Sequence, residues 1–197
     1  LACAGSEKVD TGWRDGTEDT ASAQPLGGLD PDPLWRSTEN AYATGAAFAD
    51  FDGDGDADLV VAEGTDMDPG PVRIYWNTDG ELEETASWTS AGSHYYGHLS
   101  TGDLDGDGWV DLAVSRFLGA GGFDMPGGVQ VFLNEGGVLS SHPQWEAEGF
   151  YTFSNALGDM DNDGDLDLAV AVGEAYYNEP GLSLVFENDG SGGFGDS

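Results

Sequence analysis

The sequence predicts an all-β fold in which about three similar units each contribute four short antiparallel strands. Three observations carry this prediction. An aspartate-rich motif recurs three times at nearly even intervals. Each copy leads directly into a short apolar run of the kind that forms a buried strand. Glycine-containing turns separate the remaining runs, and no stretch of the chain keeps the period of an amphipathic helix.

The repeated motif is Asp-x-Asp-x-Asp-Gly-x-x-Asp, which spans Asp50–Asp58, Asp103–Asp111 and Asp159–Asp167. The first aspartates of the copies lie 53 and then 56 residues apart. Four or five carboxylates so close together repel one another unless a cation lies among them. Oxygen ligands at alternate positions suit a hard cation, and a set of about six to eight oxygens suits calcium better than magnesium. The motif therefore predicts one calcium loop in each unit, and about three Ca²⁺ ions in the chain.

The expected ligands follow from the spacing within each loop. Side chains at positions one, three, five and nine converge on the ion, and glycine at position six permits the sharp turn. Position seven offers its backbone carbonyl, because the second loop has a tryptophan there, without a side-chain oxygen. The expected metal-binding residues are Asp50, Asp52, Asp54, Asp56 and Asp58, then Asp103, Asp105, Asp107, Trp109 and Asp111, then Asp159, Asp161, Asp163, Asp165 and Asp167.

The loop differs from an EF-hand, which begins in the same way. An EF-hand needs a bidentate Glu at position twelve between two helices. Position twelve here is Val61, Val114 or Val170, and it lies in a Leu-x-Val run that predicts a strand. The alternative interpretation is an acidic surface turn without a metal, and three copies with glycine at the same offset make it the weaker one.

The rest of each unit predicts further strands. A tryptophan precedes each loop by fourteen or fifteen residues, at Trp35, Trp88 and Trp145. After the loop and its Leu-x-Val run come a Pro-Gly turn and an alternating run that ends in asparagine. Four short strands in a repeat of about 55 residues are typical of a β-propeller blade. The expected blades are residues 34–87, 88–144 and 145–197.

These units resemble FG-GAP or VCBS-type repeats, which form the blades of integrin alpha-chain propellers and of many bacterial surface proteins. The resemblance rests on the three aspartate loops, the Leu-x-Val runs and the asparagine-ended runs Val72–Asn77, Val129–Asn134 and Leu182–Asn188. It covers about residues 34–197. It implies that the loop joins the first and second strands of a blade and fastens the blade, while ligands bind elsewhere. It also implies an adhesion or recognition module, although some members of the family are fused to enzymes.

One departure from the resemblance concerns blade number. Closed propellers of the family usually have seven blades, and this chain holds about three, so a partial propeller is expected. Three blades would expose an apolar flank at each end, because repeats bury these faces only against neighbours. Either further blades belong to a longer protein, or copies of the chain associate.

The first 33 residues predict a different kind of segment. Residues 7–33 are acidic, contain three prolines and lack an apolar period, which is typical of a flexible tether. The start Leu1-Ala2-Cys3-Ala4-Gly5 resembles the end of a bacterial lipoprotein signal, in which the cysteine is lipidated. An incidental cysteine is the alternative. Cys3 is the only cysteine, so no disulfide forms within the chain.

Charge and motifs restrict the function. The chain has 38 acidic and 5 basic side chains and a net charge of −33, which argues against nucleic acid and anionic membranes as partners. Motifs of zinc proteases, serine hydrolases and phosphate loops are absent from the sequence, so no catalytic residue is expected. His94 and His98 lie four apart on an expected strand, about 13 Å along it, which favours a structural role over zinc binding.

The expected function is therefore that of a calcium-binding, extracellular or cell-surface propeller that recognises a protein or glycan. The alternative is the propeller part of a secreted polysaccharide-degrading enzyme. Recognition is expected on the turns opposite the calcium loops, residues 63–71, 117–128 and 172–181, because they differ among the three units. The candidate ligand-contacting residues there are Asp66, Asp68, Asp124, Glu174, Tyr176 and Tyr177.

Overall fold

The computed structural model describes residues 32–174 and 179–195, and for residues 174 and 179 it describes the backbone alone. The chain divides into two units, Leu1–Pro33 and Leu34–Ser197, and all of the described strands belong to the second. Residues 1–31 of the expected tether, with the expected lipidation at Cys3, lie outside the described residues, as do Tyr176, Tyr177 and the side chain of Glu174.

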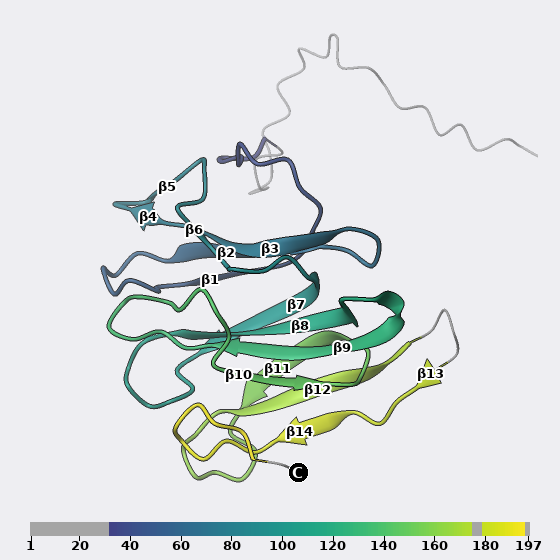
Figure 1. The fold of residues 1–197 in the computed structure, drawn as a ribbon. Coiled ribbons are helices and arrows are strands. Elements are labelled where there is room, and N and C mark those ends of the chain that lie inside the picture. The colour runs from purple at the N-terminus through teal and green to yellow at the C-terminus, as the bar shows by residue number, and fades with distance from the viewer. Residues whose placement is uncertain (1–31, 175–178, 196–197) are drawn as a thin grey trace, which may run out of the picture. The chain divides into compact units, whose positions relative to one another are not determined.

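The first sheet contains β1 (Ala43–Ala49), β2 (Asp58–Gly64), β3 (Pro69–Tyr75) and β6 (Trp88–Thr89), all antiparallel and in that order (Figure 1). A two-stranded hairpin of β4 (Asn77–Thr78) and β5 (Glu81–Leu82) follows β3. Its turn uses Asp79 and Gly80 with φ of 55° and 86°, the left-handed backbone that a two-residue hairpin turn requires.

The second and third sheets repeat this order. The second contains β7 (Tyr95–Gly102), β8 (Asp111–Gly119), β9 (Gly122–Phe132) and β10 (Trp145–Glu148). The third contains β11 (Thr152–Gly158) and β12 (Asp167–Glu174), with β13 (Glu179–Pro180) and β14 (Leu184–Phe186) both paired to β12. The described residues form strands and turns and no helix. The fold is all-β, and its antiparallel sheets of three to four strands form a partial propeller that does not close.

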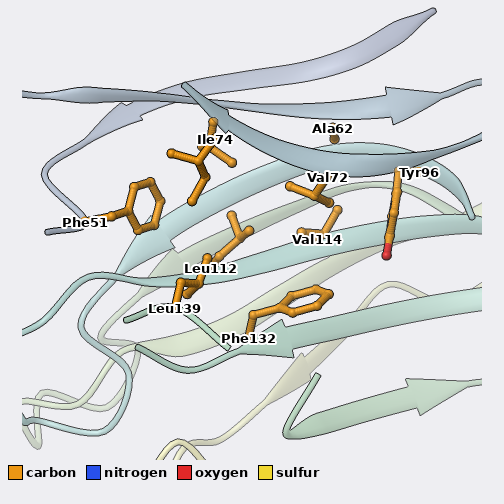
Figure 2. Packing of buried hydrophobic residues seen from close by; sticks show 10 residues of the cluster. Phe51, Ala62, Val72, Ile74, Tyr96, Leu112, Val114, Phe132 and Leu139 are labelled. Atoms are coloured by element: carbon orange, nitrogen blue, oxygen red, sulfur yellow. The ribbon is translucent and has the colours of Figure 1, made fainter. Parts of the chain in front are cut away.

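Two apolar layers hold the three sheets together. Between the first and second sheets, Phe51, Val72 and Ile74 pack against Leu112 and Phe132 (Figure 2). Between the second and third sheets, the cluster contains Leu104, Ala113, Val129, Val131, Leu168, Val170, Phe186 and Phe194. Successive residues of a strand point to opposite faces, so the middle sheet supplies side chains to both layers. This is why all nine residues of β8 are buried.

The sheets are offset from the repeats seen in the sequence. Trp88 and Trp145 lie in β6 and β10, the last strands of the first and second sheets, rather than at the start of the next unit. Their side chains nevertheless pack into the layer that faces the following sheet. Each tryptophan therefore belongs to one sheet by its backbone and to the next by its side chain.

Candidate metal centres

Each aspartate loop brings three carboxylates together. In the first loop, oxygens of Asp50, Asp52 and Asp58 lie within 4.8 Å of one another. The same positions meet in the other loops, as Asp103, Asp105 and Asp111 and as Asp159, Asp161 and Asp167. The loops connect β1 to β2, β7 to β8 and β11 to β12, so all three lie at the same end of their sheets. Three carboxylates at this spacing suit a hard divalent cation.

Side-chain to backbone hydrogen bonds shape the first loop. The Asp50 carboxylate accepts bonds from the N–H groups of Gly53 (2.7 Å) and Gly55 (3.0 Å). Asp52 accepts from the Asp54 N–H at 3.2 Å, and Asp54 accepts from the Asp56 N–H at 2.8 Å. Aspartate forms such turns readily because its short side chain reaches a backbone N–H two residues on.

The other loops repeat these bonds at the same positions. Asp103 accepts from Gly106 (2.8 Å) and Gly108 (3.0 Å), and Asp107 accepts from Trp109 (2.9 Å). In the third loop Asp159 accepts from Asn162 at 2.6 Å. The carboxylates thus fold the loop themselves, and their mutual repulsion is the cost that a cation would relieve.

Left-handed backbone at position six explains the glycine there. Gly55, Gly108 and Gly164 have φ of 97°, 91° and 106°. No atom lies within 4 Å of the place where a Cβ would be at any of the three. Backbone conformation, and not lack of space, is therefore what requires glycine at this position.

The aspartate at position nine is buried and links the loop to the asparagine that lies two residues after the third strand of the sheet. The Asp58 carboxylate accepts bonds from the N–H groups of Phe51 (2.9 Å) and Asn77 (2.8 Å). Asp111 accepts likewise from Leu104 (2.7 Å) and Asn134 (2.7 Å). Burial raises the pKa of Asp111 to about 6, although both backbone bonds act to lower it. Burial raises the pKa of Asp58 as well. A nearby cation would favour the ionised form of both groups.

The structure brings together some of the expected ligands and not others. The aspartates at positions one, three and nine form the groups described above, whereas Asp54, Asp107 and Asp163 at position five are not among them. The position-five carboxylates accept the N–H of position seven instead. The side chains of Asp56 and Asp165 also lie outside the groups, as the expected backbone role of position seven allows.

Trp109 has a contact that the sequence did not indicate. A Cβ on Gly53 would lie 2.6 Å from its ring, and one on Gly137 would lie 2.9 Å from it. The ring therefore lies against the first aspartate loop and against the β9–β10 connection. The Trp109 ring thus connects neighbouring loops. This contact is separate from the expected role of the Trp109 carbonyl as a metal ligand in the second loop.

The asparagines at the ends of the runs Val72–Asn77, Val129–Asn134 and Leu182–Asn188 make contacts that the sequence did not predict. The Asn134 side-chain amide donates to the Val110 carbonyl of its own loop (3.1 Å) and to the Phe51 carbonyl of the preceding loop (2.8 Å). Asn188 donates in the same way to Leu166 (3.1 Å) and Leu104 (2.7 Å). The recurrence of asparagine in the three runs was visible, but only the structure shows that it connects adjacent loops.

The histidine pair lies apart from the metal centres. His94 forms a backbone bridge with Gly70, and its ring packs edge-on against Tyr96 at 5.4 Å. Burial lowers the pKa of His94. His98 is exposed, and its carbonyl accepts a bond from Asn155 at 3.1 Å.

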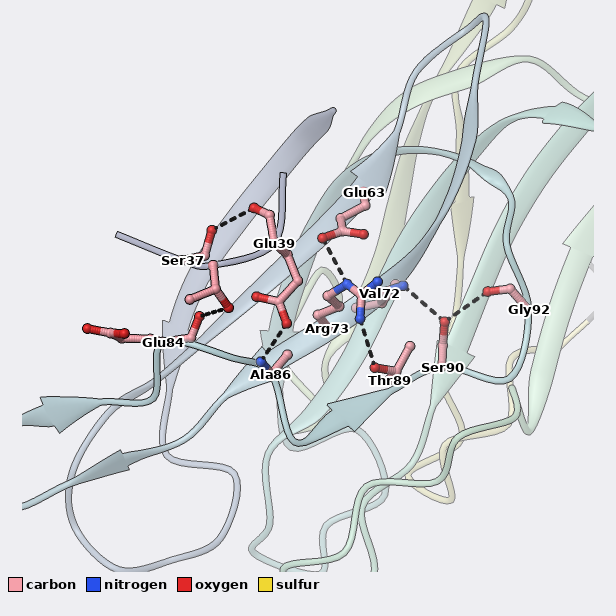
Figure 3. Close-up of polar contacts among 11 residues, drawn as sticks. Ser37, Glu39, Glu63, Val72, Arg73, Glu84, Ala86, Thr89, Ser90 and Gly92 are labelled. Carbon is pink, nitrogen blue, oxygen red and sulfur yellow. Dashed lines mark hydrogen bonds and ion pairs between the residues drawn. The ribbon is translucent and has the colours of Figure 1, made fainter. Parts of the chain in front are cut away.

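The turns opposite the loops are shorter than expected. Phe117 is fully buried in β8. Only residues 120–121 separate β8 from β9, because these two strands stay paired as far as Gly119 and Gly122. Glu63 is also buried, inside β2, where its carboxylate pairs with Arg73 at 2.9 Å (Figure 3). Asp68 and Asp124 are exposed and Asp66 is half-buried. These three remain at the end of the sheets where recognition was expected.

Comparison with known families agrees with this geometry. A family model described as an FG-GAP-like repeat matches residues 50–114. The match begins at the first aspartate of the first loop and ends in β8, after the second loop. Residues 50–114 of this chain therefore contain an FG-GAP-type repeat. The matched segment includes one complete step from loop to loop, and the third loop repeats the geometry of the other two. FG-GAP repeats in general build propeller-type recognition modules that are commonly extracellular.

Proposed function

We propose that this FG-GAP-type chain is a calcium-stabilised module that recognises an extracellular protein or glycan. The observation that carries the proposal is that a cluster of three carboxylates recurs three times, at the same positions of each loop. Calcium bound by positions one, three and nine would supply positive charge between β1 and β2 and in the equivalent places. That charge offsets the repulsion among the carboxylates and fixes the loop to the sheet.

We propose that the calcium ions have a structural role and that the chain itself has no catalytic role. The position-nine carboxylates are committed to two backbone N–H groups each, and the position-one carboxylates also hold backbone N–H groups. Groups held in this way support a loop and are poorly placed to transfer protons.

No helix among the described residues is long and apolar enough to cross a membrane.

Location outside the cell suits the expected affinity. Extracellular calcium modules bind with dissociation constants of about 10⁻⁴ to 10⁻³ M. At tenfold excess over such a constant, each site stabilises the fold by roughly 1.4 kcal/mol. Attachment to a bacterial surface through a lipid on Cys3 belongs to the same proposal.

Recognition is placed at the end of the sheets opposite the metal centres. Asp66, Asp68 and Asp124 give this end an acidic character suited to a basic protein surface or a sugar. A glycan array and a set of extracellular matrix proteins, probed in millimolar calcium, provide the test. Binding should weaken at least fivefold when Asp66 and Asp68 are both changed to asparagine.

The matched control replaces the exposed Glu135 by glutamine on the β9–β10 connection, outside that end. Binding that survives the Asp66 and Asp68 changes but is lost with Asp54→Asn and Asp107→Asn, while calcium content and thermal midpoint stay unchanged, would move recognition to the calcium end. Binding that is unchanged after both sets would refute recognition at either end of the sheets.

A further inference from the structure

The two interfaces between sheets are built from the same contacts. Position two of the loop, Phe51 or Leu104, is fully buried against the next sheet. The backbone carbonyl of that residue accepts a bond from the next sheet's asparagine, Asn134 or Asn188, at 2.8 and 2.7 Å. A sheet that carries an aspartate loop therefore offers a side chain and a carbonyl to whatever packs on its outer face.

The outer face of the third sheet offers both but has no cover among the described residues. Met160 at position two is 57% exposed, and its carbonyl accepts no hydrogen bond from the part of the chain that is described. Val185 is 40% exposed on the same face, although its equivalents Val131 and Ile74 are fully buried. Ala156 and Ala169 lie beside Val185 and complete an apolar groove.

The outer face of the first sheet has the complementary features. Phe48 is 65% exposed, although its equivalent Leu157 packs into the second apolar layer. The Asn77 side-chain amide donates to the Ala57 carbonyl of its own loop at 2.9 Å, and no bond to a second loop is present among the described residues. Asn134 and Asn188 each make that second bond.

Trp35 already occupies the place of a tryptophan from a preceding sheet. Its ring meets Tyr75 edge-on at 5.1 Å and 74°, and the Trp145 ring meets the equivalent Phe186 at 5.2 Å and 72°. Its indole N–H donates to the Glu83 carbonyl at 3.0 Å, as that of Trp88 donates to Leu139 at 3.0 Å. Trp88 and Trp145 lie in the fourth strand of the sheet before. Trp35 thus lies where a fourth strand would run, and β14 pairs only with β12 in the described part of the third sheet.

We propose that a second copy of this chain docks head to tail, with its first sheet on the outer face of the third sheet. The segment around Trp35 of one copy then lies beside β14 of the other as a fourth strand. The Asn77 amide donates to the Met160 carbonyl, and Phe48 covers the groove at Val185. A second copy fits because each of its groups repeats one that forms an interface within the chain. The net charge of −33 opposes the contact, so calcium and salt strengthen it.

The test uses two variants, Phe48→Asp for the first sheet and Val185→Asp for the third, studied by sedimentation velocity in 2 mM calcium over a wide range of concentration. Both residues are exposed, so the monomer should fold. The unchanged chain should associate as concentration rises. Each variant alone should stay monomeric at tenfold higher concentration. An equimolar mixture should form a dimer and nothing larger, because one intact face of each kind remains.

Val138→Asp is the matched control, since Val138 is 71% exposed on the second sheet's β9–β10 connection, and it should associate like the unchanged chain. Met160→Asp is a second variant of the third sheet, in case Val185→Asp lowers the thermal midpoint. A chain that remains monomeric at every concentration would overturn the proposal. So would dimers of Phe48→Asp alone, which would mean that two third sheets pair with each other.

Discussion

Adjacent strands are connected by different kinds of loop at the two ends of the sheets. At one end, three aspartate loops repeat the same hydrogen bonds and the same carboxylate groups. At the other end, residues 65–68 connect β2 to β3 through bonds to Thr65, whereas only residues 120–121 connect β8 to β9. A loop that must fix several carboxylates allows little variation, and a turn that only reverses the chain allows much. We therefore propose that the first end stabilises the fold and that the second end binds the ligand.

Loss of a position-nine carboxylate should lower the free energy of unfolding more than any change at the other end of the sheets. Asp111→Ala leaves the buried N–H groups of Leu104 and Asn134 without their acceptor. Each unsatisfied buried donor costs about 1–3 kcal/mol, so unfolding in urea with calcium present should show a loss of about 2–6 kcal/mol for the two donors. Asp124→Ala, at the other end and exposed, should stay within about 0.5 kcal/mol. Equal losses for the two variants would remove the distinction between the ends.

The asparagine bonds between loops should have the next largest effect. Asn134→Ala removes two side-chain hydrogen bonds, one of which joins the first and second sheets. Asn77→Ala removes one bond, which lies within its own loop. With about 0.5–1.5 kcal/mol for each bond, the first variant should lose roughly twice as much as the second. Chemical denaturation would contradict this account if Asn77→Ala cost as much as Asn134→Ala.

Replacement of the position-six glycine should cost about 1–2 kcal/mol, because alanine is strained in the left-handed region. Gly164→Ala tests this at φ of 106°, and Gly158→Ala is its control in the same unit. Neither position has an atom within 4 Å of an added Cβ, so the two variants differ in backbone conformation alone. Thermal unfolding should show a loss for Gly164→Ala and no loss for Gly158→Ala. Similar midpoints for both would mean that backbone strain does not matter there.

The smallest effect concerns pH in the absence of calcium. The pKa of Asp111 in the folded chain, about 6, lies above its usual value of 3.8. The folded state therefore takes up a proton at a higher pH than the unfolded state, and stability rises as pH falls from 7 towards 5. Protonation also relieves the repulsion of a chain with charge −33. Thermal midpoints in chelator should increase over this range, and the increment from added calcium should shrink. A midpoint that falls on acidification would contradict the raised pKa.

Local patterns predicted much of this structure. The all-β class, the strands after each loop and the loop positions could be read from Asp-x-Asp-x-Asp-Gly and Leu-x-Val, because these patterns depend on neighbours along the chain. The limits of the sheets could not, since Trp88 belongs to one sheet by its backbone and to the next by its side chain. The contacts of Trp109 and Asn134 join residues of different units, and spacing within one unit does not report them. The β8–β9 turn was overestimated because the length to which paired strands extend depends on both partners.

Native mass spectrometry on the calcium-loaded chain tests most directly whether the three similar loops each bind one calcium ion. We expect three bound ions for the unchanged chain and two for Asp103→Ala, which removes the position-one carboxylate of the second loop. His94→Ala combined with His98→Ala should keep all three. Fewer than three ions in the unchanged chain, or loss of an ion from the histidine variant and none from Asp103→Ala, would contradict the account.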